Sequence, residues 1–133
     1  DKGKEVEMIK QLTDSTEWMT PLPFPSVSLK EKSYNLNMWR GSSWINYSYF
    51  IYRGLKRYNY TEIAKEVAKR VINQLSKYYN SEGSFFEFYD PLCKKSPRSL
   101  PRKNNTGAIN EYGWSAALFI CFVNEEYPYS AKH

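Results

Sequence analysis

The chain has 133 residues, which suffices for one domain with a single core and is too short for two. Its hydrophobic share of 41% is ordinary for a globular protein, and no run reaches the ~18 apolar residues of a membrane span. The net charge of +5 permits an acidic partner only if the positive charge gathers on one face. We therefore expect one domain over residues 1–133 and no membrane partner.

The N-terminal third is predicted to be a short helix followed by a long loop. Apolar residues recur at helical spacing through residues 4–13, and Asp14 and Ser15 end the pattern. Residues 17–37 contain Pro21, Pro23 and Pro25, which exclude a helix and indicate an extended loop with aromatic anchors. A loop of this length inside a compact domain more often serves function than not.

Two helices joined by a tight turn are predicted next. Ser42 or Ser43 can cap a helix that runs to about Tyr58. Asn59 and Glu62 resemble a capping box for another helix that ends near Tyr79. The apolar face of this second helix is Ile63, Ala64, Val67, Ala68, Val71, Ile72 and Leu75. So short a connection makes the two helices antiparallel neighbours.

The last third is predicted to be an extended aromatic segment, a loop and an apolar helix. Residues 84–89 are too few for a helix and suggest a brief strand or extended segment, and a loop follows to about Asn110. Residues 114–127 have almost no polar face, so this helix is expected to be buried on every side. A free domain of this size cannot surround one of its own helices. The chain is therefore expected to be a part of a larger helical assembly, or a subunit that a partner completes.

The charged and sulfur-containing residues exclude several kinds of site. The two cysteines, Cys93 and Cys121, have no metal-ligand spacing, and the only histidine is His133, so we expect no metal or other cofactor. Cys121 falls in an apolar helical run, where a buried free thiol is expected. The basic run contains Ser and Pro without interleaved aromatic residues, which predicts a surface loop and no nucleic-acid partner. Its members are Lys94, Lys95, Arg98, Arg102 and Lys103.

The first candidate site lies at the start of the helix expected after Ser42. Trp39 offers a flat face for stacking, and Arg40 offers a fork of hydrogen-bond donors. Gly41 allows the chain to turn into the helix, and Asn46 adds an amide one turn further on. Composition alone favours simple packing for Trp39 and Trp44.

The second candidate site is the aromatic segment from Ser84 to Asp90. Glu87 lies between aromatic residues, and a poorly solvated carboxylate accepts a proton from water more readily. Asp90, which precedes Pro91, is better explained as a turn residue. Taken alone, this segment is also compatible with an edge strand that points Glu87 to solvent.

Four linked motifs lie along the chain: MWRGSSWINY at 38–47, RGLKRY at 53–58, FFEFYDPL at 85–92 and YGWSAAL at 112–118. Together they resemble one family, glycoside hydrolase family 63, whose members include processing α-glucosidases and mannosylglycerate hydrolases. The resemblance covers nearly the whole chain, and the order and spacing of the motifs also fit.

This resemblance implies an all-α fold of antiparallel helix hairpins that form the C-terminal part of an (α/α)6 toroid. It implies an inverting exo-α-glycosidase acting on terminal α-linked glucose or mannose, with Glu87 as the general base. The general acid would be an Asp in an earlier motif, which has no match here, so this chain alone is expected to be inactive. The substrate would be an oligosaccharide or small glycoside, and the rest of the toroid would belong to a longer chain or a partner subunit. The implied sugar-binding residues are Trp39, Arg40, Trp44, Asn46 and Trp114.

Departures from the family pattern keep other interpretations open. Met38 stands where the family commonly has Tyr, and the loop from Cys93 to Asn110 is longer and more basic than usual. The main alternative is a noncatalytic carbohydrate-binding or interaction subunit derived from the same fold. A basic RNA-binding module is a third hypothesis, and it predicts affinity that falls steeply with salt.

Overall fold

The computed structural model describes residues 2–103 and 106–128, so His133 lies outside the described residues. This part of the chain forms four α-helices: α1 (Lys2–Leu12), α2 (Ile45–Arg57), α3 (Thr61–Glu82) and α4 (Gly113–Glu126). Two short 3-10 helices, Met38–Arg40 and Pro97–Ser99, lie in the loops. Extended segments meet in the described part only as isolated bridges, which join Pro25 to Ser43 and Ser43 to Tyr89. The predicted all-α class with long loops is confirmed.

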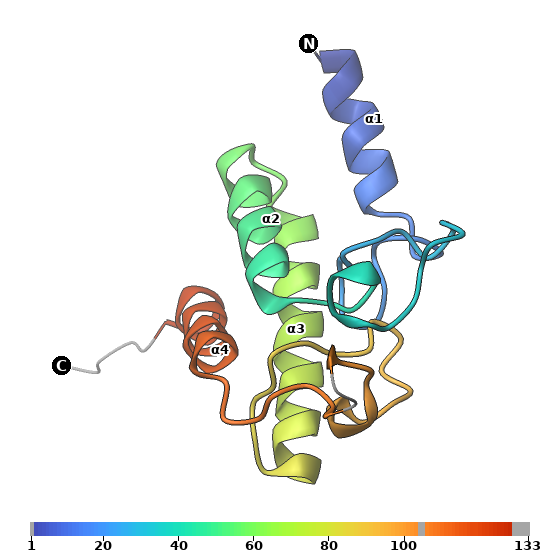
Figure 1. The fold of residues 1–133 in the computed structure, drawn as a ribbon. Coiled ribbons are helices and arrows are strands. Elements are labelled where there is room, and N and C mark those ends of the chain that lie inside the picture. The colour runs from blue at the N-terminus through green and yellow to red at the C-terminus, as the bar shows by residue number, and fades with distance from the viewer. Residues whose placement is uncertain (1, 104–105, 129–133) are drawn as a thin grey trace, which may run out of the picture.

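Three helices pack together and the fourth stands apart. Figure 1 shows α2 and α3 as an antiparallel pair, and α2, α3 and α4 all contact one another. In the same view, α1 extends away from these helices, while the loop segments gather beside α3. The hydroxyl of Tyr60 ties α1 to the body by donating a hydrogen bond to Glu5 over 2.7 Å.

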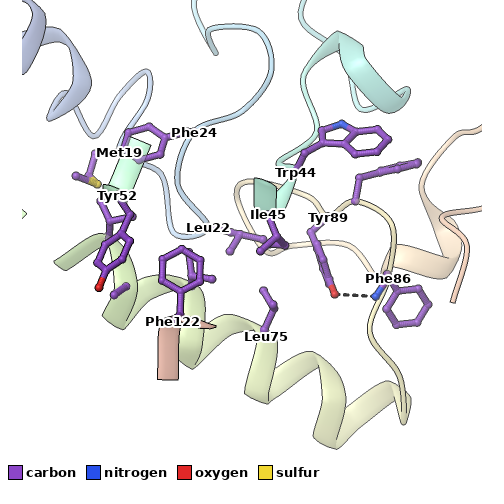
Figure 2. Close-up of a cluster of buried hydrophobic side chains, with 14 of the residues drawn as sticks. Met19, Leu22, Phe24, Trp44, Ile45, Tyr52, Leu75, Phe86, Tyr89 and Phe122 are labelled. Atoms are coloured by element: carbon purple, nitrogen blue, oxygen red, sulfur yellow. Dashed lines mark hydrogen bonds between the residues drawn. The ribbon is translucent and has the colours of Figure 1, made fainter. Parts of the chain in front are cut away.

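The core combines the inner faces of the helices with aromatic side chains from the loops. Figure 2 shows Leu22, Ile45 and Leu75 together with the rings of Tyr89 and Phe122. The apolar face predicted for α3 is largely confirmed, because five of its residues are buried: Ala64, Val67, Ala68, Val71 and Leu75. The long loop predicted for residues 17–37 also contributes Leu22 and Phe24 to this core, so its aromatic anchor is real.

The predicted helix caps are wrong. The Ser42 hydroxyl donates to the carbonyl of Leu36 and the Ser43 hydroxyl donates to that of Leu22, both over 2.8 Å. No side chain caps α2 or α3. Glu62, expected to cap α3, pairs with Lys65 instead. The serine hydroxyls join the long loop to the start of α2, because the loop supplies buried carbonyl groups that need donors.

Two further predictions about the helices need correction. The α3 helix continues to Glu82, three residues beyond the predicted end near Tyr79. The α4 helix is apolar, yet only Ser115 and Phe122 are buried, while Ile120 is 56% exposed. It packs on α2 and α3, and its Trp114 and Ile120 side chains stay exposed. Cys121, expected to be a buried thiol, is therefore only half-buried, and both cysteines are free.

Polar contacts join α4 to α2. The hydroxyl of Tyr49 and the guanidinium of Arg53 both donate to Glu125, over 2.7 and 2.9 Å. The Tyr52 hydroxyl donates to Glu126. Burial, followed by this carboxylate, raises the pKa of Tyr52 far above its usual range, so the hydroxyl remains a donor. No helix in the part of the chain that the structure describes is long and apolar enough to cross a membrane.

Candidate active site

The aromatic segment around Glu87 is held along both of its edges by backbone hydrogen bonds. On one edge, Ser43 and Tyr89 exchange two bonds, of 2.9 and 3.0 Å. On the other, the N–H of Glu87 donates to the carbonyl of Ile109 over 2.9 Å, and that of Tyr112 donates to Phe85 over 3.1 Å. The segment is extended, as predicted, but forms no regular strand. The backbone of Glu87 is therefore fixed by residues far away in the sequence.

Two side chains complete the support of this backbone. The Ser115 hydroxyl, at the start of α4, donates to the carbonyl of Phe86 over 2.7 Å. The N–H of Phe86 donates to the hydroxyl oxygen of Tyr89 over 2.7 Å, as the dashed line in Figure 2 shows. Burial raises the pKa of Tyr89 far above its usual range, and the bond from Phe86 offsets only part of this.

The Glu87 side chain is buried and has one charged partner. The residue is 7% exposed, and the Arg102 Nε donates to its Oε2 over 2.9 Å. In the described part of the chain, no buried side-chain oxygen or nitrogen lacks a hydrogen-bond partner. The Oε1 atom accepts no hydrogen bond from the described residues, so it must be reached by solvent. Glu87 thus has one oxygen fixed by a cation and one open to water.

The basic loop that carries Arg102 is anchored at several points. The carboxylate of Asp90 accepts hydrogen bonds from the backbone N–H groups of Leu92, Lys94 and Lys95, which confirms Asp90 as a turn residue. The Arg98 guanidinium binds the Glu82 carboxylate over 3.1 Å and lies over the ring of Phe86. The loop closes where Ala108 donates to the carbonyl of Pro97.

The turn that carries Trp39 forms a second feature near this segment. Trp39 stacks flat on Trp44, with ring centroids 3.5 Å apart and an angle of 5° between the planes. Trp44 is 2% exposed, whereas Trp39 is 43% exposed, so one face of the stack is open. Gly41 has a φ of 151° and packs against the carbonyl of Asn35, and it turns the chain towards α2 as predicted.

The other predicted site residues are placed around these two features. Arg40 is exposed, and among the described residues its guanidinium has no ion-pair partner. Asn46 is buried in the first turn of α2. Trp114 is 48% exposed in the first turn of α4, next to the Ser115 that bonds to Phe86.

The structure brings the two motif segments together through aromatic contacts. Because Ser43 pairs with Tyr89, Trp44 and Phe88 lie opposite each other, and their ring centroids are 5.2 Å apart. Aromatic rings therefore pack in series from Trp39 through Trp44 to Phe88, the residue beside Glu87. No hydrogen bond links the Glu87 carboxylate to Trp39, Arg40 or Asn46 within the described residues.

Sequence reasoning missed the role of Arg102. It was one of five cations in the basic run, and nothing in the local pattern distinguishes it from Lys103. One feature of the sequence could have indicated this contact. The basic loop follows the Glu87 motif and leads to α4, so it stays close to that motif. Only the anchoring of the loop by Asp90 and Arg98 determines which cation reaches the carboxylate.

Comparison with known proteins defines the class. A mannosylglycerate hydrolase of glycoside hydrolase family 63 from Thermus thermophilus, solved in complex with glucose, superposes with a TM-score of 0.62 at 22% identity. The superposition covers 90% of this chain and 25% of that protein. The chain is thus all-α, with helix hairpins that correspond to part of an (α/α)6 toroid.

Sequence comparison then gives the family. Residues 1–115 match the family described as mannosylglycerate hydrolase MGH1-like glycoside hydrolase domain, and the chain belongs to this family of glycoside hydrolases. A Schizosaccharomyces pombe protein described as "Probable mannosyl-oligosaccharide glucosidase" is 28% identical across 96% of this chain. A mannosylglycerate hydrolase of Rubrobacter radiotolerans is 28% identical across 68% of it. The chain spans only 16% and 17% of the lengths of these relatives. The family resemblance of the four motifs is confirmed.

Proposed function

We propose that this chain is part of an inverting exo-α-glycosidase that hydrolyses terminal α-linked glucose or mannose, and that Glu87 is its general base. The observation that carries the proposal is the state of the Glu87 carboxylate. It is buried on a fixed backbone, with Oε2 held by Arg102 and Oε1 open to water. A general base needs this combination, because it must be ionised, correctly oriented and in contact with the water that it activates.

Inversion requires a second carboxylate. The general acid protonates the leaving oxygen while the base activates water on the opposite face of the sugar, and the two carboxyl groups stand ~6.5–9.5 Å apart. Asp90 is not available for this role, since three backbone amides occupy its carboxylate. We assign the general acid to the remainder of the toroid, either in the same polypeptide or in a partner subunit.

The sugar-binding role is assigned to the residues around the tryptophan stack. The open face of Trp39, with Trp44 rigid behind it, suits stacking on a sugar ring. Arg40 keeps its donors available for hydroxyl groups. We assign Asn46 and Trp114 to the same sugar-binding role. The choice of glucose or mannose rests on the names of the relatives, which are a glucosidase and mannosylglycerate hydrolases.

Replacing Glu87 with Gln in the complete glycosidase tests the proposal. The amide preserves shape but cannot accept the proton from water, so kcat should fall by about 10²–10⁴-fold while sugar binding, measured by calorimetry, persists. The matched control is Glu111→Gln, an exposed carboxylate on the loop that contacts the same segment, which should leave kcat unchanged.

The outcome also separates the enzyme from its main rival. Unchanged turnover in Glu87→Gln would remove this residue from the mechanism. A complete protein that binds sugar through Trp39 but hydrolyses no glycoside would instead be the noncatalytic carbohydrate-binding subunit.

A further inference from the structure

We infer that Arg102 is a positioning residue for Glu87, and that the basic loop which follows the Glu87 motif serves to deliver this guanidinium to the carboxylate. The inference rests on the proposed function, because it concerns the same carboxylate. It adds a second residue to the reaction and explains why a cation from the loop is half-buried. The side chain of Arg102 is only 25% exposed, and that of Glu87 is 9% exposed.

The geometry assigns different tasks to the two oxygens of Glu87. The Arg102 Nε fixes Oε2 over 2.9 Å, and the backbone N–H of Glu87 is held by Ile109. With both ends restrained, the carboxylate has little freedom to rotate, and Oε1 keeps a constant direction. A base held in this way meets its water at a defined position, which lowers the entropy cost of the reaction.

The charge of Arg102 offsets the effect of burial. Burial disfavours the charged form of a carboxylate, and a guanidinium in contact favours it. The contact with Arg102 therefore places a compensating positive charge on an otherwise buried carboxylate. Among the described residues, it is the only cation that bonds to this carboxylate.

The other charged groups on the neighbouring segments are occupied or exposed. Arg98 pairs with Glu82, and the carboxylate of Asp90 is held by backbone amides. The remaining titratable or charged side chains on the segments that meet at Glu87 are Arg40, Tyr78, Tyr79, Tyr89, Cys93, Lys94, Lys95, Lys103, Glu111 and Tyr112. None of them forms a hydrogen bond or ion pair with Glu87 in the described part of the chain.

The loop is built in a way that suits this task. Gly107 has a φ of 73°, and a Cβ atom at this position would lie 2.2 Å from the carbonyl oxygen of Arg98. The two sides of the loop therefore pack backbone to backbone, with Pro97 and Ala108 joined by a 3.0 Å hydrogen bond. Arg102 extends from a closed loop whose base is anchored on α3 through Arg98 and Glu82.

The test measures kcat/KM against pH in the complete glycosidase for Arg102→Gln, Arg102→Lys and the matched control Lys103→Gln. Without the guanidinium, the buried Glu87 carboxylate lacks its counter-charge, so the acid limb of the profile should shift in Arg102→Gln. We expect kcat to fall while KM stays close to wild type. Arg102→Lys keeps the positive charge but not the planar set of donors of the guanidinium. Its pH profile should therefore lie between those of wild type and Arg102→Gln. Lys103→Gln, a change at an exposed neighbour, should leave the profile unmoved.

The outcomes separate this inference from the proposed function. An unmoved acid limb in both Arg102 variants, with kcat lowered or not, would overturn the positioning role and leave the role of Glu87 intact. If circular dichroism shows that Arg102→Gln has lost its fold, Arg102→Lys provides the test instead. A shifted acid limb in Arg102→Lys then supports the inference, and a wild-type acid limb refutes it. Wild-type turnover in Glu87→Gln would instead contradict the proposed function itself.

Discussion

At the scale of single residues, the site depends on a few backbone positions that other side chains cannot occupy. Gly41 is one of them, because its φ of 151° is rarely adopted by other residues. A Cβ atom there would lie 2.4 Å from the Asn35 carbonyl oxygen and 2.6 Å from the ring of Tyr34. The turn that presents Trp39 therefore requires glycine.

Replacing Gly41 with Ala is expected to destabilise the protein by about 1–3 kcal/mol, because the turn must open to relieve these contacts. Chemical denaturation measures the loss. The control is Gly54→Ala in α2, where a Cβ atom meets nothing within 4 Å. That change should be neutral or stabilise the helix by up to about 1 kcal/mol. Equal stability of Gly41→Ala and wild type would show that the turn adapts freely.

At the scale of elements, α4 is joined to α2 by carboxylates as well as by packing. Glu125 accepts hydrogen bonds from Tyr49 and Arg53. Burial raises the pKa of Glu125, but these two donors outweigh burial and leave the pKa below its ordinary value of 4.5. A carboxylate with a lowered pKa stabilises the fold above the unfolded-state pKa, and this contribution is lost as the pH falls through the folded-state value.

The stability difference between wild type and Glu125→Gln should therefore be full near neutral pH and shrink as the pH falls below about 4.5. Free energies of unfolding measured across this range check the prediction. Glu62→Gln provides the comparison, since the side chain of Glu62 is 85% exposed and should add little pH dependence. A difference for Glu125→Gln that grows on acidification would contradict the assigned direction.

Much of the element order could be predicted from the sequence, because apolar spacing reports the buried face of a helix. The α2–α3 hairpin was predicted on this ground, and the irregular loop before Trp39 was predicted from its three prolines. The caps were not, since the hydroxyls of Ser42 and Ser43 bond to carbonyls of the long loop, and local pattern cannot reveal such distant partners. The pairing of Arg102 with Glu87 was missed for the same reason.

At the scale of the whole molecule, two observations point the same way. Apolar side chains of α4 are exposed, and the chain spans only a small part of the length of its relatives. Ile120 and Trp114 are exposed on a helix that has almost no polar face. The superposition on the Thermus thermophilus enzyme covers only 25% of that protein. The chain thus has the fold of part of a toroid.

The most direct test of the central claim is rescue of a Glu87→Ala variant by azide in the complete glycosidase, with an activated α-glycoside as substrate. Azide needs no deprotonation and fits the space that the carboxylate leaves, so it should replace the activated water. We predict that Glu87→Ala hydrolyses the substrate about 10²–10⁴-fold more slowly than wild type and that azide restores turnover. The product should then be a β-glycosyl azide, identified by NMR. Hydrolysis at the wild-type rate, or no azide product from a folded variant, would contradict the role of Glu87 as general base.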